Sequence, residues 1–277
     1  MKEKIAFIGL GEMGLGMALN LLKSGYEVYG FDTKKSVCDE ATEKGIIVCD
    51  SVKCAAGESD NAVISVVRNY NQTESVIFGE NGILSSSKAG LTIIVMSTLA
   101  PVELGLLAEK VEKEGHVLVD APVSGAKSRA DDGSLTIMTA GNKEAIDKCE
   151  GYFNAMGGNV FYFGEKVGSA QAAKLSNNLM LGINMIGCVE GLRFGKNFGL
   201  SSDTLIELLK VSSGNSWVVQ NWDVVSKWWY EYVPNETLDI VHKDLLSVLK
   251  ICFDEKITLP VGTLTFSCLL DALKAED

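Results

Sequence analysis

Only two histidines occur in the 277 residues, and none of the seven cysteines belongs to a C-x-x-C pair. A metal site built from several histidines is therefore excluded, and a zinc site is not expected, so no metal cofactor is predicted. The number of cysteines is odd and their spacing is irregular. Both features are typical of buried, reduced thiols in a cytosolic protein rather than of a disulfide framework.

Basic residues are also in the minority. The chain has 25 Lys and Arg against 36 Asp and Glu, which gives a net charge of −11. This charge argues against nucleic acid or an anionic membrane as the main partner. The longest apolar run, at about residues 179–189, is interrupted by Asn184 and is too short to span a bilayer. Because a strand pattern begins almost at Met1, no room is left for a signal peptide, and we expect a cytoplasmic protein.

What the sequence does contain is a glycine-rich turn directly after an apolar run at residues 5–8. The turn reads G-x-G-x-x-G and consists of Gly9, Leu10, Gly11, Glu12, Met13 and Gly14. The first glycine of such a turn permits a tight strand-to-helix connection, the second lets backbone approach a pyrophosphate, and the third lets the helix pack closely on the strand. The free N–H groups that begin the helix then face the phosphates. We therefore predict a dinucleotide cofactor at this turn.

The residues after the turn strengthen this prediction. A helical pattern closes at Gly25, and a strand pattern at residues 27–31 is followed by Asp32. That acid lies about 20 residues beyond the glycines, where a carboxylate accepts hydrogen bonds from the adenosine ribose. A carboxylate there would repel the 2′-phosphate of NADP, although Lys34 or Lys35 could reach such a phosphate. The predicted cofactor is NAD, with NADP possible.

Strand and helix patterns alternate from Lys4 to about Asp120, which predicts a parallel sheet covered by helices on both faces. The strand patterns lie at residues 5–8, 27–31, 46–48, 61–67, 91–96 and 117–119, with helices at 13–23, 34–44, 70–78 and 102–114. Two more strands, at residues 133–139 and 160–163 around a helix at 143–155, are expected to extend this sheet.

The second half of the chain contains helical patterns only, at residues 167–198, 203–211, 216–230, 238–255 and 260–275. The predicted fold class is therefore α/β. An N-terminal Rossmann-type, doubly wound sheet is expected at residues 1–163, followed by an all-helical C-terminal domain at residues 164–277.

Ligands of parallel sheets bind at the carboxyl ends of the strands, so polar residues after strand patterns are candidate site residues. Val67 and Arg68 follow the fourth pattern, and the Arg68 guanidinium could contact adenine or a phosphate, or simply be solvated. Ser97 and Thr98 follow the fifth pattern. They could cap a helix, or their hydroxyls could bond the nicotinamide ribose.

Two further groups could bind a substrate. Ser124 and Gly125 offer a hydroxyl and backbone N–H groups to a carboxylate. Lys174 and Asn178 are four residues apart on a predicted helix and therefore share a face. A partly desolvated lysine can act as a general base near neutral pH, whereas a surface lysine can lie over an apolar helix without a chemical role. The helix alone favours the second interpretation.

Five motifs occur in order over nearly the whole chain: the glycine turn at 9–14, D-A-P-V-S-G at 120–125, K-L-S-N-N at 174–178, S-S-G-N-S-W at 212–217 and K-D at 243–244. In this order they resemble the β-hydroxyacid dehydrogenase family, which contains 3-hydroxyisobutyrate dehydrogenase and tartronate semialdehyde reductase.

The resemblance implies roles for these residues. Lys174 would be the general acid/base, and Ser124, Gly125 and Asn178 would bind the substrate carboxylate and hydroxyl. Lys243 would lie near nicotinamide and substrate, oriented by Asp244. The implied cofactor contacts are Gly9, Leu10, Gly11, Met13, Gly14, Asp32, Val67, Arg68, Thr98 and Lys243.

The resemblance also implies a small anionic hydroxy acid or semialdehyde as substrate, and a homodimer or homotetramer formed through the helical domain. Ala126 departs from the family, which usually has a second glycine there, and Val67-Arg68 replaces the usual Leu-Pro. Lys127 and Arg129 could favour a second anionic group on the substrate, or be solvated. An unusual aromatic group could serve core or subunit packing, or line the cleft: Trp222, Trp228, Trp229, Tyr230 and Tyr232.

The leading hypothesis is an NAD(P)-dependent oxidoreductase that interconverts a short 3-hydroxy acid and its semialdehyde or keto form by hydride transfer. One alternative is an oxidative decarboxylase of the 6-phosphogluconate dehydrogenase type. Such an enzyme would need extra basic residues to bind a phosphosugar and a longer helical domain, which this chain lacks. Another is a non-catalytic nucleotide-binding module. The joint presence of Lys174, Asn178 and Ser124 argues against it.

Overall fold

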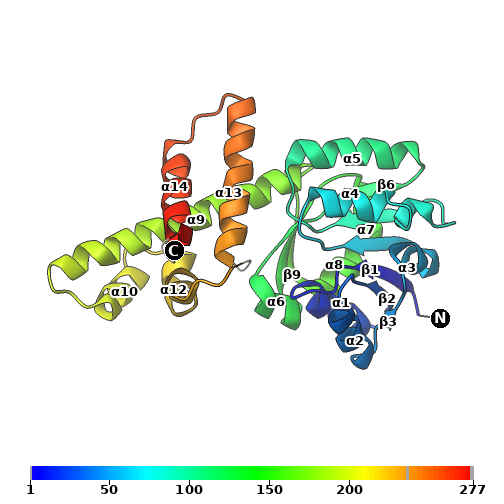
Figure 1. Ribbon diagram of the computed structural model, residues 1–277, viewed down its shortest axis with the longest axis horizontal. Helices are drawn as coiled ribbons and strands as arrows, with labels where there is room; N and C mark the ends of the chain where they lie inside the picture. Colours follow the sequence, from blue (N-terminus) through cyan, green and yellow to red (C-terminus); the bar gives the residue numbers. More distant parts are fainter. Residues whose placement is uncertain (1, 235–236, 275–277) are drawn as a thin grey trace. The chain divides into compact units, whose positions relative to one another are not determined.

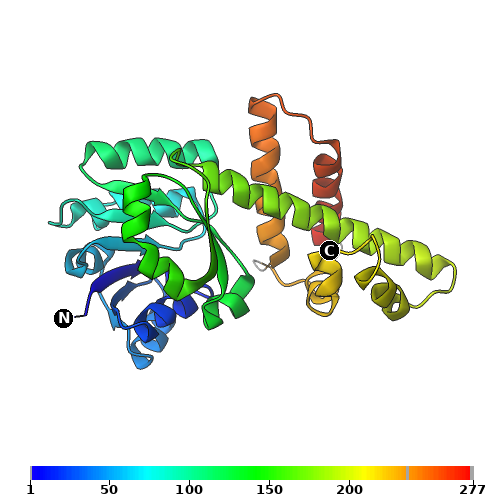
Figure 2. The same ribbon diagram turned by 180° about the vertical axis from the view of Figure 1, so that it is seen from behind.

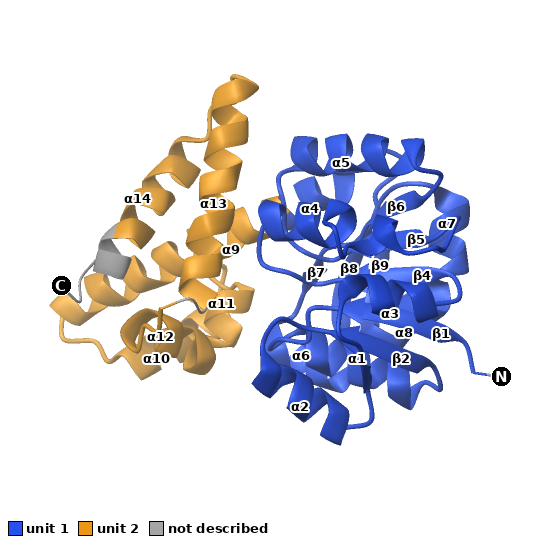
Figure 3. Cartoon of the chain, turned by 45° about the vertical axis from the view of Figure 1, so that its right-hand side comes forward, with its two compact units in different colours: residues 1–174 blue, residues 175–277 orange. Residues whose placement is uncertain are grey.

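The computed structural model describes residues 2–234 and 237–274. They belong to two compact units, Met1–Lys174 and Leu175–Asp277, coloured blue and orange in Figure 3. We call them the N-terminal unit and the C-terminal unit.

The N-terminal unit is built on a six-stranded parallel sheet with the order β3-β2-β1-β4-β5-β6. The strands are β1 Lys4–Ile8, β2 Glu27–Phe31, β3 Ile47–Val48, β4 Ala62–Ser65, β5 Thr92–Val95 and β6 Val117–Asp120. All six coincide with predicted strands, and the parallel sheet confirms the predicted fold class. The strand order reverses between β1 and β4, and such a reversal is where doubly wound sheets bind their ligands.

Both faces of this sheet are buried, and the two faces pack against different helices (Figures 1 and 2). Alternate side chains of β1 show this, because Ile5 and Phe7 belong to one apolar cluster while Ala6 and Ile8 belong to another. The first cluster includes residues of α1 Gly14–Lys23, α2 Lys35–Glu43, α6 Ala126–Asp132, α7 Lys143–Lys148 and α8 Glu150–Met156. The second includes residues of α3 Val52–Glu58, α4 Tyr70–Phe78, α5 Pro101–Lys113 and the short 3₁₀ helix Ile83–Ser85.

The last strands of the unit form a separate sheet, so the prediction that they extend the large one is wrong. The order of this three-stranded sheet is β7-β8-β9, with β7 Val123–Ser124, β8 Leu135–Thr139 and β9 Gly157–Tyr162. Proline has no N–H for a ladder, and Pro122 stands where the chain leaves β6. After it β7 pairs antiparallel with β8, and a single bridge, Asp120 to Ala140, joins the two sheets.

Local details also differ from the sequence pattern. The expected helix at residues 143–155 is divided at Cys149 into α7 and α8, and the expected helix at 216–230 is divided at Asn221. The Asn221 side chain donates to the carbonyl of Trp217 at 2.8 Å, which closes the preceding turn locally. The short helices α3 and α6 have no counterpart among the predicted elements.

The C-terminal unit is helical, as predicted. The long helix α9 Ser169–Asn197 enters it from the N-terminal unit, and α10 Ser202–Lys210, α11 Trp217–Gln220, α12 Trp222–Tyr230, α13 Thr237–Asp254 and α14 Pro260–Lys274 follow. Part of the predicted last helix, from residue 275, lies outside the described residues. The core gathers α9, α12 and α13 around Met185, Val225 and Leu245. Within the described chain, no helix has both the length and the apolar content to cross a membrane.

The unusual aromatic group serves this core. Four of its members pack against the core cluster, namely Trp222, Trp228, Trp229 and Tyr232. Trp228 also stacks on Trp217, with ring centroids 6.1 Å apart. The fifth member, Tyr230, is 65% exposed and meets the edge of Trp222. Core packing, the first of the two interpretations, accounts for four of the five rings.

One buried histidine couples the stability of the N-terminal unit to pH. The His116 Nδ1 atom accepts a hydrogen bond from the Leu91 N–H at 3.1 Å, and the side chain is 7% exposed. Burial lowers the pKa of His116, and the nearby Glu114 carboxylate opposes this only in part. The folded protein therefore keeps His116 neutral at a pH where the unfolded chain takes up a proton.

We expect a stability contribution from His116 that is present above its ordinary pKa of 6.5 and is lost as the pH falls below it. In His116→Gln the amide oxygen can still accept from Leu91, but nothing titrates. Urea unfolding of both proteins at pH 7.5 and pH 5.5 should show the smaller loss of stability in the variant. Both proteins contain His242, so its contribution to the pH dependence cancels in the comparison. An equal loss in the two proteins would contradict the assignment.

Candidate functional site

The glycine turn after β1 meets the steric conditions of a dinucleotide site. Gly9 has φ +94°, and a Cβ added there would lie 2.1 Å from the carbonyl oxygen of Val66. A Cβ on Gly14 would lie 1.9 Å from the Gly9 oxygen, so only glycine lets α1 begin this close to the strand. A Cβ on Gly11 would meet nothing within 4 Å. The space that pyrophosphate needs is therefore open at Gly11, and the residues present fit a bound dinucleotide.

Asp32 ties this turn to the end of β2. One carboxylate oxygen accepts from the backbone N–H of Leu10 at 2.9 Å, and the other accepts from that of Lys34 at 2.9 Å. A carboxylate has about four lone-pair sites, so both oxygens keep capacity for a ribose hydroxyl. Lys34 and Lys35 are exposed beside it. Met13 precedes α1 with helical dihedral angles and packs against the core.

A hydrogen bond joins the loop after β4 to the loop after β5. The Ser97 hydroxyl accepts from the backbone N–H of Val67 at 2.9 Å, and Ser97 is 3% exposed. Helix α5 begins after Ala100 without a side-chain cap, so the interpretation of Ser97 and Thr98 as a capping pair is wrong. Arg68 is exposed, and its backbone N–H donates to Gln72 at 2.9 Å. Thr98 is half-buried at the carboxyl end of the sheet.

Ser124 ends β7, and Gly125 connects it to α6. Gly125 has φ +144°, and a Cβ there would lie 2.7 Å from both Cβ and Cδ of Arg129. The Arg129 side chain therefore lies over the Gly125 backbone, with the residue exposed. Ala126, where the family usually has glycine, has φ +57°, a conformation that costs an alanine free energy and a glycine almost none.

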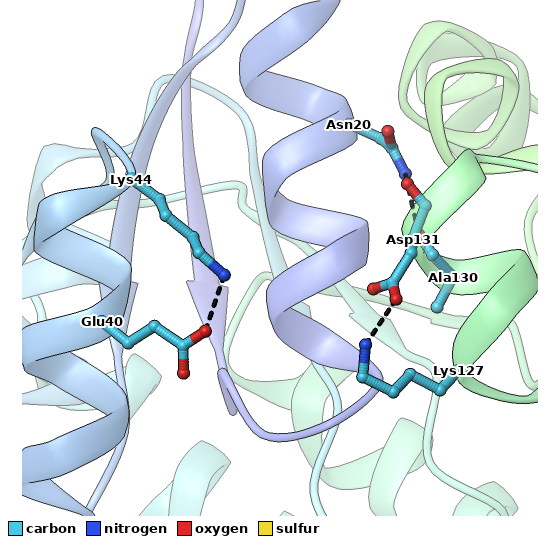
Figure 4. A network of polar contacts seen from close by, with 6 residues as sticks. All are labelled: Asn20, Glu40, Lys44, Lys127, Ala130 and Asp131. Atoms are coloured by element: carbon cyan, nitrogen blue, oxygen red, sulfur yellow. Dashed lines mark hydrogen bonds and ion pairs between the residues drawn. The ribbon is translucent and has the colours of Figure 1, made fainter.

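Helix α6 is fastened to α1. The Asn20 side chain donates to the carbonyls of Ala130 at 2.8 Å and Asp131 at 3.3 Å, and Lys127 pairs with the Asp131 carboxylate four residues on (Figure 4). Lys127 is thus partly neutralised within its own helix, and of the two basic residues Arg129 lies against the Ser124–Gly125 connection.

Asp120 is the buried acid of the N-terminal unit. One of its oxygens accepts from the backbone N–H groups of Gly168, Ala170 and Gln171, at 2.8, 3.1 and 3.2 Å. The other accepts from the Gln171 amide at 2.9 Å. Complete burial raises the pKa of Asp120 to about 6, and these four hydrogen bonds only partly oppose the rise. The carboxylate thereby fastens the start of α9 to the end of β6.

Lys174 follows Gln171 by one turn of α9 and is 9% exposed. This burial fits a partly desolvated amine better than a surface lysine lying over an apolar helix.

Four polar residues of the C-terminal unit contact one another. The Asn178 amide donates to one oxygen of Asp244 at 2.6 Å, while Lys243 pairs with the other oxygen at 3.2 Å. Asn178 and Asp244 are 4% and 1% exposed. The Asn177 amide donates to the Asn178 oxygen at 3.1 Å. Asp244 therefore orients Asn178 as well as Lys243, and both were predicted to bind substrate.

The candidate residues thus fall into two groups. The N-terminal unit carries those that end or follow strands, together with Lys174 on α9. The former are the glycine turn with Leu10 and Met13, Asp32, Val67, Arg68, Thr98, Ser124 and Gly125. The C-terminal unit carries Asn178 and Lys243. The sequence analysis missed the contacts of Asp120 and Gln171, and the second contact of Asp244. The sequence did contain two signals for these contacts: Asp120 is the last residue of a strand, and Gly168 directly precedes a helix. In residues 2–234 and 237–274 no cluster of His, Cys, Asp and Glu could hold a metal ion.

The sequence also matches two families of known proteins. Residues 4–164 match the NAD binding domain of 6-phosphogluconate dehydrogenase, and residues 168–277 match the NAD-binding domain of NADP-dependent 3-hydroxyisobutyrate dehydrogenase. Together the two matches cover most of the chain.

Individual relatives agree with these matches. The L-threonate dehydrogenase of Cupriavidus necator is 33% identical over 262 residues, which are 95% of this chain and 88% of that protein. The mitochondrial 3-hydroxyisobutyrate dehydrogenase of Rattus norvegicus is 40% identical over 216 residues, 78% of this chain and 64% of that protein. A structure of a Mycobacterium tuberculosis 3-hydroxyisobutyrate dehydrogenase with L-serine has a TM-score of 0.89 at 25% identity, covering 99% of this chain and 95% of that one. The chain therefore belongs to the β-hydroxyacid dehydrogenase family and is an NAD(P)-dependent dehydrogenase of hydroxy acids.

Proposed function

We propose that this protein interconverts a short 3-hydroxy acid and its semialdehyde or keto form by hydride transfer, with Lys174 as the general acid/base. The observation that carries the proposal is the position of Lys174. It is a buried lysine on a helix whose first turn is fastened to the carboxyl end of the sheet that bears the dinucleotide turn. Bound nicotinamide supplies the hydride acceptor or donor at its C4 atom.

The protein's own part in the reaction is to hold the substrate and move one proton. In oxidation a neutral Lys174 takes the proton of the substrate hydroxyl. The carbon that bears this hydroxyl gives a hydride to the cofactor, and the C–OH group becomes a carbonyl. In reduction the ammonium returns that proton to the oxygen. A lysine can do this near neutral pH when burial disfavours its charged form.

The anionic end of the substrate requires donors. We propose that the Ser124 hydroxyl and the Gly125 N–H bind the carboxylate, and that Asn178 and Lys243, oriented by Asp244, contribute to the same substrate. The names of two relatives, an L-threonate dehydrogenase and a 3-hydroxyisobutyrate dehydrogenase, support our proposal of a short carbon chain. We further propose a dinucleotide-binding domain at residues 1–163, a helical substrate domain at 164–277, and a cytoplasmic homodimer or homotetramer assembled through the helical part.

An oxidative decarboxylase is the second candidate, because residues 4–164 match the 6-phosphogluconate dehydrogenase cofactor domain. The match of residues 168–277 to the 3-hydroxyisobutyrate dehydrogenase type favours simple hydride transfer. Carbon dioxide release from the hydroxy acid during turnover would decide for the decarboxylase.

Replacing Lys174 tests the assignment of the proton carrier. In Lys174→Ala we expect turnover to fall by about 10²- to 10⁴-fold, the usual contribution of general acid–base catalysis, while the NADH dissociation constant changes little. Absorbance at 340 nm with 3-hydroxyisobutyrate, L-serine and L-threonate gives the rates, and fluorescence titration gives the binding. Lys148→Ala is the matched control, since Lys148 pairs with Glu144 in an exposed salt bridge. Turnover of Lys174→Ala within about tenfold of the parent would reject the role.

Asp32 tests the cofactor preference. Removing its charge in Asp32→Ser should lower the ratio of kcat/KM with NAD to that with NADP by at least about tenfold, because a 2′-phosphate is no longer repelled. Asp39→Ser, on the exposed surface of α2, changes the net charge equally and should leave the ratio alone. A ratio that is the same in parent and Asp32→Ser would show that Asp32 does not select the cofactor.

A further inference from the structure

The Asp120 carboxylate binds the backbone N–H groups at the start of α9. Asp120 closes β6, is fully buried, and accepts three backbone N–H groups of residues 168–171 together with the Gln171 side-chain amide. Those N–H groups begin a helix and have no partner within it, so the acid replaces the missing acceptors and interacts favourably with the positive end of the helix. With both of its oxygens engaged and no exposed surface, Asp120 is not placed to bind substrate.

Gln171 joins this carboxylate to the loop after β5. Its amide oxygen accepts from the Leu99 N–H at 2.8 Å, and its amide nitrogen donates to the Ser97 carbonyl at 3.0 Å and to Asp120. Both amide hydrogens are used, and the residue is fully buried. The Ser97 hydroxyl in turn accepts a hydrogen bond from the Val67 N–H. One chain of hydrogen bonds therefore links the loops after β4 and β5, the end of β6 and the start of α9.

A glycine allows the close approach that these bonds require. Gly168 has φ +99°, and a Cβ there would lie 2.6 Å from the carbonyl oxygen of Pro101, the first residue of α5. The helix start is thus fixed against α5 as well as against β6. Since the backbone of an α-helix is stiff over one turn, fixing residues 168–171 also fixes the rotation and height of residue 174.

We propose that Asp120 and Gln171 are positioning residues for the reaction: they act as a pair that sets the position of the Lys174 amine relative to the cofactor-binding loops, and neither touches the substrate. This inference rests on the proposed role of Lys174. It differs from a purely structural role, in which the pair would stabilise the fold without affecting the chemical step.

The test uses three variants of the whole protein. Asp120→Asn places an amide N–H against N–H donors, and Gln171→Met keeps the side-chain volume but removes all three hydrogen bonds. Asn142→Ala is the control, because Asn142 caps α7 in the same unit through the Ala145 N–H at 2.9 Å and lies outside the hydrogen-bond chain. For each we would measure kcat, KM for the hydroxy acid, the NADH dissociation constant and the melting temperature.

We expect kcat to fall by about 10- to 100-fold in Asp120→Asn and in Gln171→Met, the usual effect of misplacing a catalytic group by about 1 Å. The NADH dissociation constant should stay within about twofold, and the double variant should lose less than the product of the two single losses, because the residues act as a unit. Asn142→Ala should lower the melting temperature without lowering kcat. If Asp120→Asn fails to fold, Gln171→Met, which keeps the carboxylate and its backbone donors, decides alone.

Two results would overturn the inference. The first is a kcat within about twofold of the parent in Gln171→Met despite a lowered melting temperature, which would make the pair structural only. The second is a raised KM with unchanged kcat, which would make one of them a substrate ligand. Lys174→Ala separates these results from failure of the proposed function. If Lys174→Ala turns over normally, the assignment of Lys174 is wrong, whereas its collapse beside a normal Gln171→Met rejects the positioning role alone.

Discussion

The burial of one carboxylate at the start of α9 organises the candidate site. A buried charge is costly unless hydrogen bonds replace its hydration, and Asp120 receives four of them. The balance still leaves the pKa of Asp120 raised, to about 6, so desolvation outweighs the donors. An apolar residue would avoid this cost, but it would leave the helix N–H groups and one N–H of the Gln171 amide without their acceptor. The carboxylate is therefore better explained by the position it imposes on α9 than by net stability.

The C-terminal unit uses the same device on a smaller scale. Asp244 is almost fully buried and divides its two oxygens between the Asn178 amide and the Lys243 ammonium. Amide and ammonium groups that bind a substrate must keep their orientation when the substrate is absent, and a shared anion provides this. Each unit thus contains a buried acid that holds polar groups in place and has almost no surface of its own.

The features that sequence analysis predicted well are those decided locally. The glycine turn is an example, because the positive φ of Gly9 and the contact of Gly14 with the Gly9 carbonyl both arise within the turn itself. The parallel strands are another, since short apolar runs separated by amphipathic helices leave few other folds. The second sheet was missed because its separation depends on Pro122 and on antiparallel pairing over a distance that no periodicity reveals. The Asp120–Gln171 contact spans 51 residues, and the roles of the site residues stay predictions.

The segment after Ser124 has an unusual backbone conformation at Ala126, where the family resemblance implied a glycine. Ala126 takes a positive φ that glycine would adopt without strain, and α6 is fastened to α1 through Asn20. Strain at a position without a packing reason is usually retained for what it places nearby. Here it begins the helix that brings the Arg129 side chain over Gly125. In a protein of net charge −11, this exposed arginine adds positive charge beside Gly125, which we propose binds the substrate carboxylate.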